Sequence, residues 1–157
     1  MPDELDRARD ERIFLLNEKL ISKFVGNRLT FTFDNNQFYV LNSGCVTELI
    51  NSEIGIKCLL GILNSKLLNF YFSNVFTDYR ETFPIMKSGN VENLPIIVPS
   101  ISIQNQITDL ADDILNLKIM NSIENTIELE KQIDDLVYKL YNLTPEEIAI
   151  VEENTKK

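Results

Sequence analysis

Residues 129–148 read LEKQIDDLVYKLYNLTPEEI, and this stretch predicts two helices joined by a short turn. Apolar side chains recur there at helical spacing and form one stripe: Leu129, Ile133, Leu136, Val137, Leu140 and Tyr141. Thr144 has the chemistry of a helix N-cap, Pro145 suits the first helical position, and Glu147 completes a capping box. An apolar stripe needs a partner, so we expect these helices to pack against the rest of the chain.

A second helical pattern precedes this stretch. From Ser102, apolar residues recur through Leu115, and a break is predicted between residues 116 and 125. The chain from Ser100 onward carries five Lys and twelve Asp or Glu, a net charge of −7 out of −9 for all 157 residues. Paired acids such as Asp112 with Asp113 fit the solvated faces of amphipathic helices better than a metal site or an acid-base site.

The region before the helices is rich in strand patterns. Residues 19–25 and 28–33 alternate between apolar and polar side chains, and residues 37–41 and 45–49 are predicted as two further strands. The turn signals Gly26-Asn27, residues 34–36 and residues 42–44 separate the four segments. In residues 28–33, Arg28, Thr30 and Thr32 share one face. Residues 56–76 predict a buried helix, and residues 94–99, with a proline near each end, predict an edge strand.

These patterns predict an α+β fold: a small antiparallel β meander packed on a buried helix, followed by C-terminal amphipathic helices. We divide the chain into a charged N-terminal segment or linker (1–18), a β-rich region (19–100) and a helical region (101–157). The most apolar run, 58–76, contains Asn64, Lys66 and Asn69, so a transmembrane helix is not expected. The acidic N-terminus does not resemble a signal peptide, and we expect a cytoplasmic protein with no membrane partner.

Several kinds of catalytic site are missing from the sequence. There is no histidine, no Gly-x-Gly, no Asn-Pro-Pro-Tyr and no Asp/Glu-x-Lys tripeptide. These absences exclude histidine-based catalysis, a dinucleotide loop of the Gly-x-Gly type and the usual nuclease core. Cys45 and Cys58 cannot form a zinc site alone and are expected to be reduced, partly buried thiols. We expect a non-catalytic chain that binds no cofactor itself.

Segments in four parts of the chain, in the same order, resemble one protein family. They are 19–21 through Asp34 to 39–43, then LLGILNSKLLNFY at 59–71, then 94–99 with Gln106, and the tail 133–147. Together they are similar to the TaqI-like C-terminal specificity domain of type II restriction-modification methyltransferases. The tail is also similar to sequences near type I specificity subunits.

The resemblance implies a DNA target-recognition module whose partners are double-stranded DNA and an upstream methyltransferase or nuclease domain of the same polypeptide. S-adenosylmethionine and Mg²⁺ would then belong only to that upstream part. The alternative is a helical protein-interaction or dimerisation module, such as part of a type I specificity subunit, and a homodimer is one arrangement it would allow.

The net charge of −9 argues against strong DNA binding by the whole chain, but residues 19–90 carry seven Lys or Arg and five Asp or Glu, a net charge of +2. DNA contact is expected first from Arg80, Thr82 and Lys87, in the segment where related proteins carry a polar loop. The further candidates are Lys19, Lys23, Arg28, Ser88 and Asn90. For each of them an ordinary solvated side chain is the competing interpretation. Asn64 and Ser65 are expected to stabilise helix packing instead.

Overall fold

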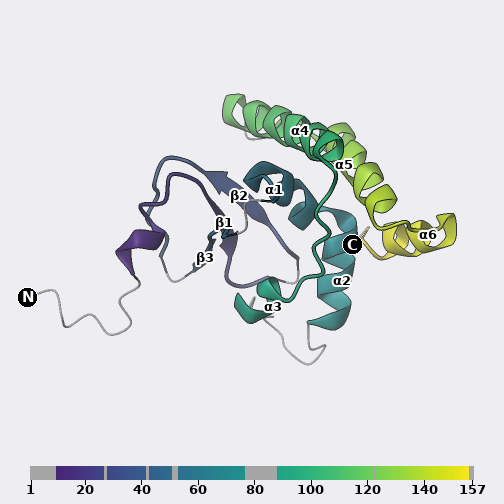
Figure 1. The fold of residues 1–157 in the computed structure, drawn as a ribbon, viewed down its shortest axis with the longest axis horizontal. Coiled ribbons are helices and arrows are strands. Elements are labelled where there is room, and N and C mark those ends of the chain that lie inside the picture. Colours follow the sequence, from purple (N-terminus) through teal and green to yellow (C-terminus); the bar gives the residue numbers. More distant parts are fainter. Residues whose placement is uncertain are drawn as a thin grey trace, which may run out of the picture.

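The computed structural model describes residues 10–26, 28–41, 43–50, 53–76, 88–121 and 123–155. Within these ranges it contains a short 3-10 helix, η1 (Glu11–Ile13), three strands and six α-helices. A small sheet packs on the first α-helix, and a pair of long helices also packs against that helix (Figure 1). The predicted α+β class is confirmed.

The sheet is antiparallel and has its first strand in the centre. β1 (Lys19–Lys23) pairs with β2 (Phe31–Asp34) on one side and with β3 (Gly44–Thr47) on the other. The order β2-β1-β3 differs from a meander, in which the second strand would lie between the other two. Leu20 and Phe31 face the helices and belong to the hydrophobic core.

Residues 37–41, predicted as a strand, do not form one. The carboxylate of Asp34 accepts the backbone N–H groups of Asn36 and Phe38, at 2.8 and 3.0 Å. Gln37 has a φ of 56°, in the left-handed region that ends an extended run. Because these bonds fold the chain into a tight turn after β2, the next segment does not pair with β2 and the third strand starts only at Gly44.

The single helix predicted over residues 56–76 is two helices. α1 (Ile56–Asn64) ends at Ser65, which has an extended backbone, and α2 (Lys66–Val75) begins directly after it. The Ser65 hydroxyl accepts the backbone N–H of Leu68 and donates to the carbonyl of Ile62, so it caps both helix ends. Six of the nine α1 residues are buried hydrophobic side chains, which agrees with the expected burial of this region.

α3 (Ser88–Glu92) is followed by an extended segment, 94–99, that pairs with no strand among the described residues. The prediction of an edge strand there was wrong. Pro95 and Pro99 have no N–H to donate, and a tyrosine side chain takes the place of a neighbouring strand. The hydroxyl of Tyr141 donates to the carbonyl of Pro95 at 2.6 Å and accepts the N–H of Ile97 at 3.3 Å.

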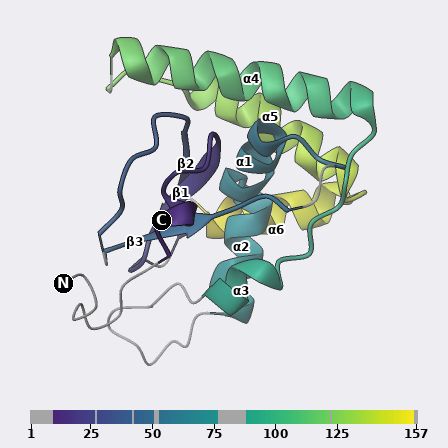
Figure 2. The same ribbon diagram turned by 60° about the vertical axis from the view of Figure 1, so that its left-hand side comes forward.

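The C-terminal helices are α4 (Ile101–Met120), α5 (Ile127–Leu140) and α6 (Pro145–Asn154). α4 and α5 run side by side and cover α1 (Figure 2). A Cβ at Gly61 in α1 would lie 2.6 Å from Ile107 of α4 and 3.6 Å from Ile133 of α5, so the three helices meet at this glycine. The predicted capping box of Thr144 and Glu147 is confirmed.

Cys45 is half-buried and Cys58 is buried, and no disulfide joins them. Burial raises the pKa of the Cys58 thiol to about 11, which makes it a poor nucleophile. Among the described helices, none combines the length and the apolar character that crossing a bilayer requires.

Candidate nucleic-acid interface

The face of the sheet that points away from the helices carries basic and hydroxyl side chains. Lys23 at the end of β1 and Thr32 in β2 are exposed. The alternation continues before β2, where exposed Arg28 and Thr30 flank buried Leu29. Lysine, arginine and threonine side chains on one face are suitable donors to phosphate oxygens.

A groove of about 630 Å³ lies between β2 and the helices α4 and α5. Residues 28–32 line one wall, and parts of α1, α2, α4 and α5 line the rest. Four of the lining residues are cationic: Arg28, Lys66, Lys118 and Lys131. Two are acidic, Glu130 and Asp134, so the groove is net positive although the chain as a whole is acidic.

The four cations differ in what they bind. Lys66 pairs with Glu152 at 2.8 Å and with Asp134 at 3.6 Å. The ammonium of Lys118 donates to the backbone carbonyl of Glu124. Within the described part of the chain, Arg28, Lys118 and Lys131 have no carboxylate within ion-pair distance. These three side chains, from separate elements, can therefore neutralise an external anion.

A junction at the end of α1 fixes the two walls of the groove relative to each other. The Asn64 carboxamide accepts the N–H of Phe31 at 2.8 Å and donates to the same residue's carbonyl at 2.9 Å. The backbone N–H of Lys66 donates to Asp134 of α5 at 2.8 Å. β2, α2 and α5 are thus joined through consecutive residues. The predicted helix-stabilising role holds for Ser65, whose hydroxyl bonds both α1 and α2, whereas the Asn64 side chain joins α1 to the sheet.

Asp134 lies at the floor of this junction and is 4% exposed. Burial raises the pKa of its carboxyl to about 6, against the opposing effect of the Lys66 N–H and ammonium. Glu152, which accepts the hydroxyl of Tyr138 at 2.9 Å, raises the Asp134 pKa further. The cluster of Lys66, Asp134, Tyr138 and Glu152 links α2, α5 and α6, and its function is structural.

Seven of the eight predicted DNA-contacting residues fall in three groups. Lys23 and Arg28 share the exposed sheet face, and Arg28 also lines the groove. Ser88 and Asn90 belong to α3, which lies on the opposite side of the molecule from α4 (Figures 1 and 2). Arg80, Thr82 and Lys87 lie outside the described residues.

Lys19, a further candidate, cannot contact a phosphate. Its side chain is fully buried, pairs with Asp34 at 2.5 Å and donates to the carbonyl of Phe14 at 2.8 Å. The alternating pattern of β1 could not predict the burial of Lys19, because its partner Phe14 lies in the segment before the sheet.

Sequence reasoning missed two of the three groove cations that have no carboxylate partner among the described residues. Lys118 and Lys131 lie on helices in which acidic residues outnumber basic ones. The net negative charge of these helices gave no indication of a basic site. Thr30 and Thr32 could have been proposed, since the sequence already placed them on the face of Arg28.

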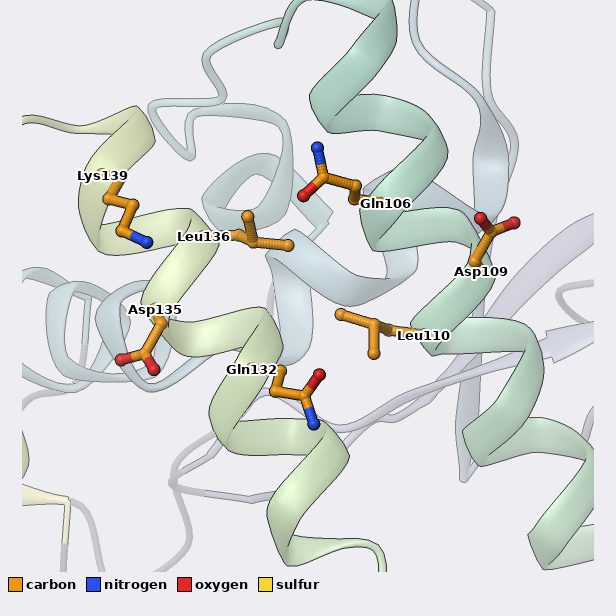
Figure 3. A pocket seen from close by; sticks show the side chains of 7 residues that line it. All are labelled: Gln106, Asp109, Leu110, Gln132, Asp135, Leu136 and Lys139. Atoms are coloured by element: carbon orange, nitrogen blue, oxygen red, sulfur yellow. The ribbon is translucent and has the colours of Figure 1, made fainter.

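A second hollow, of about 420 Å³, lies between α4 and α5 (Figure 3). Leu110 and Leu136 point toward each other across it, with Gln106 and Gln132 beside them. The charged residues around it are Asp109, Asp135 and Lys139, so it carries more negative than positive charge. This hollow is unsuited to phosphate. The described residues also contain no group of three side chains suited to hold a metal ion.

The model of a protein family described as TaqI-like C-terminal specificity domain matches residues 1–96, more than half of the chain. No curated protein matches the sequence. The matched residues include the whole sheet, α1, α2 and α3. Arg28, Asn64 and Lys66 are therefore inside the match, whereas Lys118, Lys131 and Asp134 lie beyond it.

Proposed function

Because the chain belongs to the family of TaqI-like C-terminal specificity domains, we propose that it recognises a double-stranded DNA target for a restriction-modification enzyme. The groove beside β2 and the adjoining sheet face would lie against the duplex. Methyl transfer or cleavage would be carried out by a separate domain of the same polypeptide, and that domain would hold S-adenosylmethionine or Mg²⁺.

One observation carries this proposal. Arg28, from the β region, and Lys118 and Lys131, from α4 and α5, line the same groove without carboxylate partners among the described residues. In a chain with net charge −9, cations that line one groove without carboxylate partners are explained by an anionic ligand. Thr30 and Thr32 add hydroxyl donors to the wall of the groove, and Lys23 extends the donor surface beside it.

The number of cations sets the expected strength of binding. A few phosphate contacts give an affinity that falls steeply with salt, by roughly one unit of log–log slope for each contact. The acidic helices α4, α5 and α6 work against binding at long range. We therefore expect weak binding by this chain alone, observable at low ionic strength.

The test is a fluorescence anisotropy titration of a labelled duplex at several salt concentrations. We expect Arg28→Ala and Lys131→Ala each to weaken binding to every duplex and to reduce the salt slope by about 1. Lys139→Ala is the matched control, because Lys139 is also an exposed lysine of α5 but lines the other hollow. Equal losses in Lys131→Ala and Lys139→Ala would contradict a specific interface and indicate a general effect of charge.

A second candidate function is a helical interaction module, and the end of the α4–α5 pair favours it. Four large apolar side chains there are mostly exposed: Ile119, Met120, Ile123 and Ile127. Such a patch often marks a protein contact. Light scattering coupled to size-exclusion chromatography tests this candidate, since a dimer that Ile119→Gln with Ile123→Gln converts to a monomer would support it, and a wild-type monomer at high concentration would contradict it.

A further inference from the structure

The turn after β2, residues 35–38, is held by a buried ion pair. Lys19 and Asp34 have side-chain exposures of 0% and 2%, and their charged atoms lie 2.5 Å apart. Asp34 also accepts the N–H groups of Asn36 and Phe38, so one carboxylate fixes both the lysine and the turn. Burial works to raise the pKa of Asp34, but Lys19 and the two backbone donors outweigh it and lower the pKa.

Additional contacts fix this turn in place. Gln37, at φ 56°, donates from its side chain to the carbonyl of Leu15 at 2.9 Å. Tyr39 stacks on Phe14 with ring centroids 5.0 Å apart, and its hydroxyl donates to Glu11 at 2.7 Å. A buried charge pair and a left-handed residue are both costly, and they persist only where the surrounding structure holds them.

This rigid turn presents side chains that the fold itself does not use. Phe38 is 62% exposed, and Asn35 and Asn36 are also exposed. The two amides bond each other, Asn36 Nδ2 to Asn35 Oδ1 at 3.1 Å. The remaining groups, Asn35 Nδ2 and Asn36 Oδ1, bond no other described residue, so the pair offers one donor and one acceptor side by side.

Asp34, the strand residue directly before the turn, lies on the same face of the sheet as Lys23 of the proposed interface. Lys19 and Lys23 are on the same face of β1, and Asp34 is opposite Lys19 in the register. Lys19, which lies opposite Asp34, is four strand residues from Lys23, a distance of roughly 13 Å along β1. One duplex can cover this distance.

We propose that Asn35, Asn36 and Phe38 read the sequence of the DNA target, with the amide pair facing an adenine and the phenyl ring contacting the neighbouring base step. This inference rests on the proposed function and adds the part of the molecule that sets sequence preference. Lys19 and Asp34 are positioning residues, since they touch no ligand and hold the turn.

The chemistry of the turn matches base edges better than phosphate. In the major groove adenine shows the N7 acceptor and the N6 donor, which complement an amide donor and an amide acceptor. An exposed aromatic ring can contact a thymine methyl group or enter a base step. The turn itself carries no cation to neutralise a phosphate, and Glu11 lies beside it, so backbone contacts are left to the groove.

The test selects bound duplexes from a randomised pool with the 157-residue chain and then measures competition between the preferred and a scrambled duplex. We expect an adenine-containing preference that the double variant Asn35→Ala with Asn36→Ala reduces on the order of 10-fold. Phe38→Ala should abolish the fluorescence increase of 2-aminopurine placed at the contacted step. Both variants should keep the wild-type salt slope, because neither removes a phosphate contact.

The outcomes separate this inference from the proposed function. If the variants of Asn35, Asn36 and Phe38 keep the sequence preference of the wild type, the assignment of the turn is overturned. It is also overturned if the wild-type chain binds all duplexes equally well. No binding of the wild type to any duplex at low salt would contradict the proposed function together with the inference. Asn154→Ala, which changes an exposed amide at the end of α6, is the control and should leave preference, affinity and melting temperature unchanged.

Discussion

The side chain of Asn64 pairs with both backbone groups of Phe31, accepting its N–H and donating to its carbonyl. Asn64 thus occupies the outer edge of β2 at the place where another strand would pair. One amide from a helix end thereby closes the sheet edge and joins it to the helical layer.

Replacing Asn64 by Ala should lower the free energy of unfolding by about 1–3 kcal/mol, because two backbone groups of Phe31 lose their partners. Asn64→Asp should have a similar effect, since a carboxylate cannot donate to the carbonyl. Urea denaturation monitored by circular dichroism gives the measurement. Asn93→Ala, where the amide only bonds a carbonyl within α3, is the control and should change stability by less than about 0.5 kcal/mol.

Asp34→Asn should destabilise the chain by about 3–5 kcal/mol, because it leaves the Lys19 ammonium buried without a counter-charge. Lys19→Met combined with Asp34→Leu should recover most of that loss, as apolar replacements of buried ion pairs do. The recovered variant should nevertheless lose the order of residues 35–38, seen as faster amide hydrogen exchange at Asn36 and Phe38. Slow exchange retained in the double variant would show that other contacts hold the turn.

The acid sensitivity of this ion pair follows from the pKa of Asp34. Its pKa in the folded chain is lowered below the ordinary 3.8, so the stabilisation is present above that value and is lost as pH falls through the folded pKa. The turn should therefore stay ordered at pH 4 and lose protection only at more acidic pH, which exchange measurements across this range can follow.

Gly61→Ala should destabilise the chain by about 1–3 kcal/mol, because the new methyl group would lie 2.6 Å from Ile107 of α4. Ile107→Leu in the same chain should restore part of the stability, because leucine lacks the Cγ2 methyl group that the new side chain would meet. Gly89→Ala is the matched control, since nothing lies within 4 Å of a Cβ at that helical glycine. It should be neutral or slightly stabilising by the helix propensity of alanine.

The sequence predicted the elements whose signal is local. The stripe from Leu129 to Tyr141 and the capping box at Thr144 need only helical spacing and neighbouring residues, and both are present in the structure. Arg28, Thr30 and Thr32 were placed on one strand face by alternation alone, and all three are exposed.

The elements that depend on distant partners were not predictable in the same way. The break at Ser65 is invisible in the hydrophobic pattern, which continues from α1 into α2. The extended segment 94–99 carries strand-like residues, yet the hydroxyl of Tyr141 takes the place of a second strand. The groove cations Lys118 and Lys131 meet Arg28 only after α4 and α5 fold back over α1.

The four sequence segments that resemble the specificity-domain family contact one another in the folded chain. Gly61 packs against α4 and α5, Lys66 pairs with Asp134 of the tail, and Tyr141 of the tail binds the Leu-Pro segment. Their joint occurrence therefore has a physical cause: each segment supplies one side of a contact with another.

Asp134 gives the chain a pH dependence of its own. Burial raises its folded pKa to about 6, above the ordinary 3.8, so protonation favours the folded state. That contribution is fully present below the unfolded pKa and is lost as pH rises through about 6, a difference of roughly 2 kcal/mol between pH 4 and pH 8 for this residue.

Asp134→Asn should remove this dependence, because the amide oxygen can still accept the N–H of Lys66 but carries no charge. We expect the variant to be as stable as the wild type or more stable at pH 8, and to lose that advantage toward pH 5. Urea denaturation at both pH values gives the comparison, with exposed Asp135→Asn as the control. A variant that is less stable than the wild type by the same amount at both pH values would mean that the ion pair with Lys66 outweighs the burial of the carboxylate.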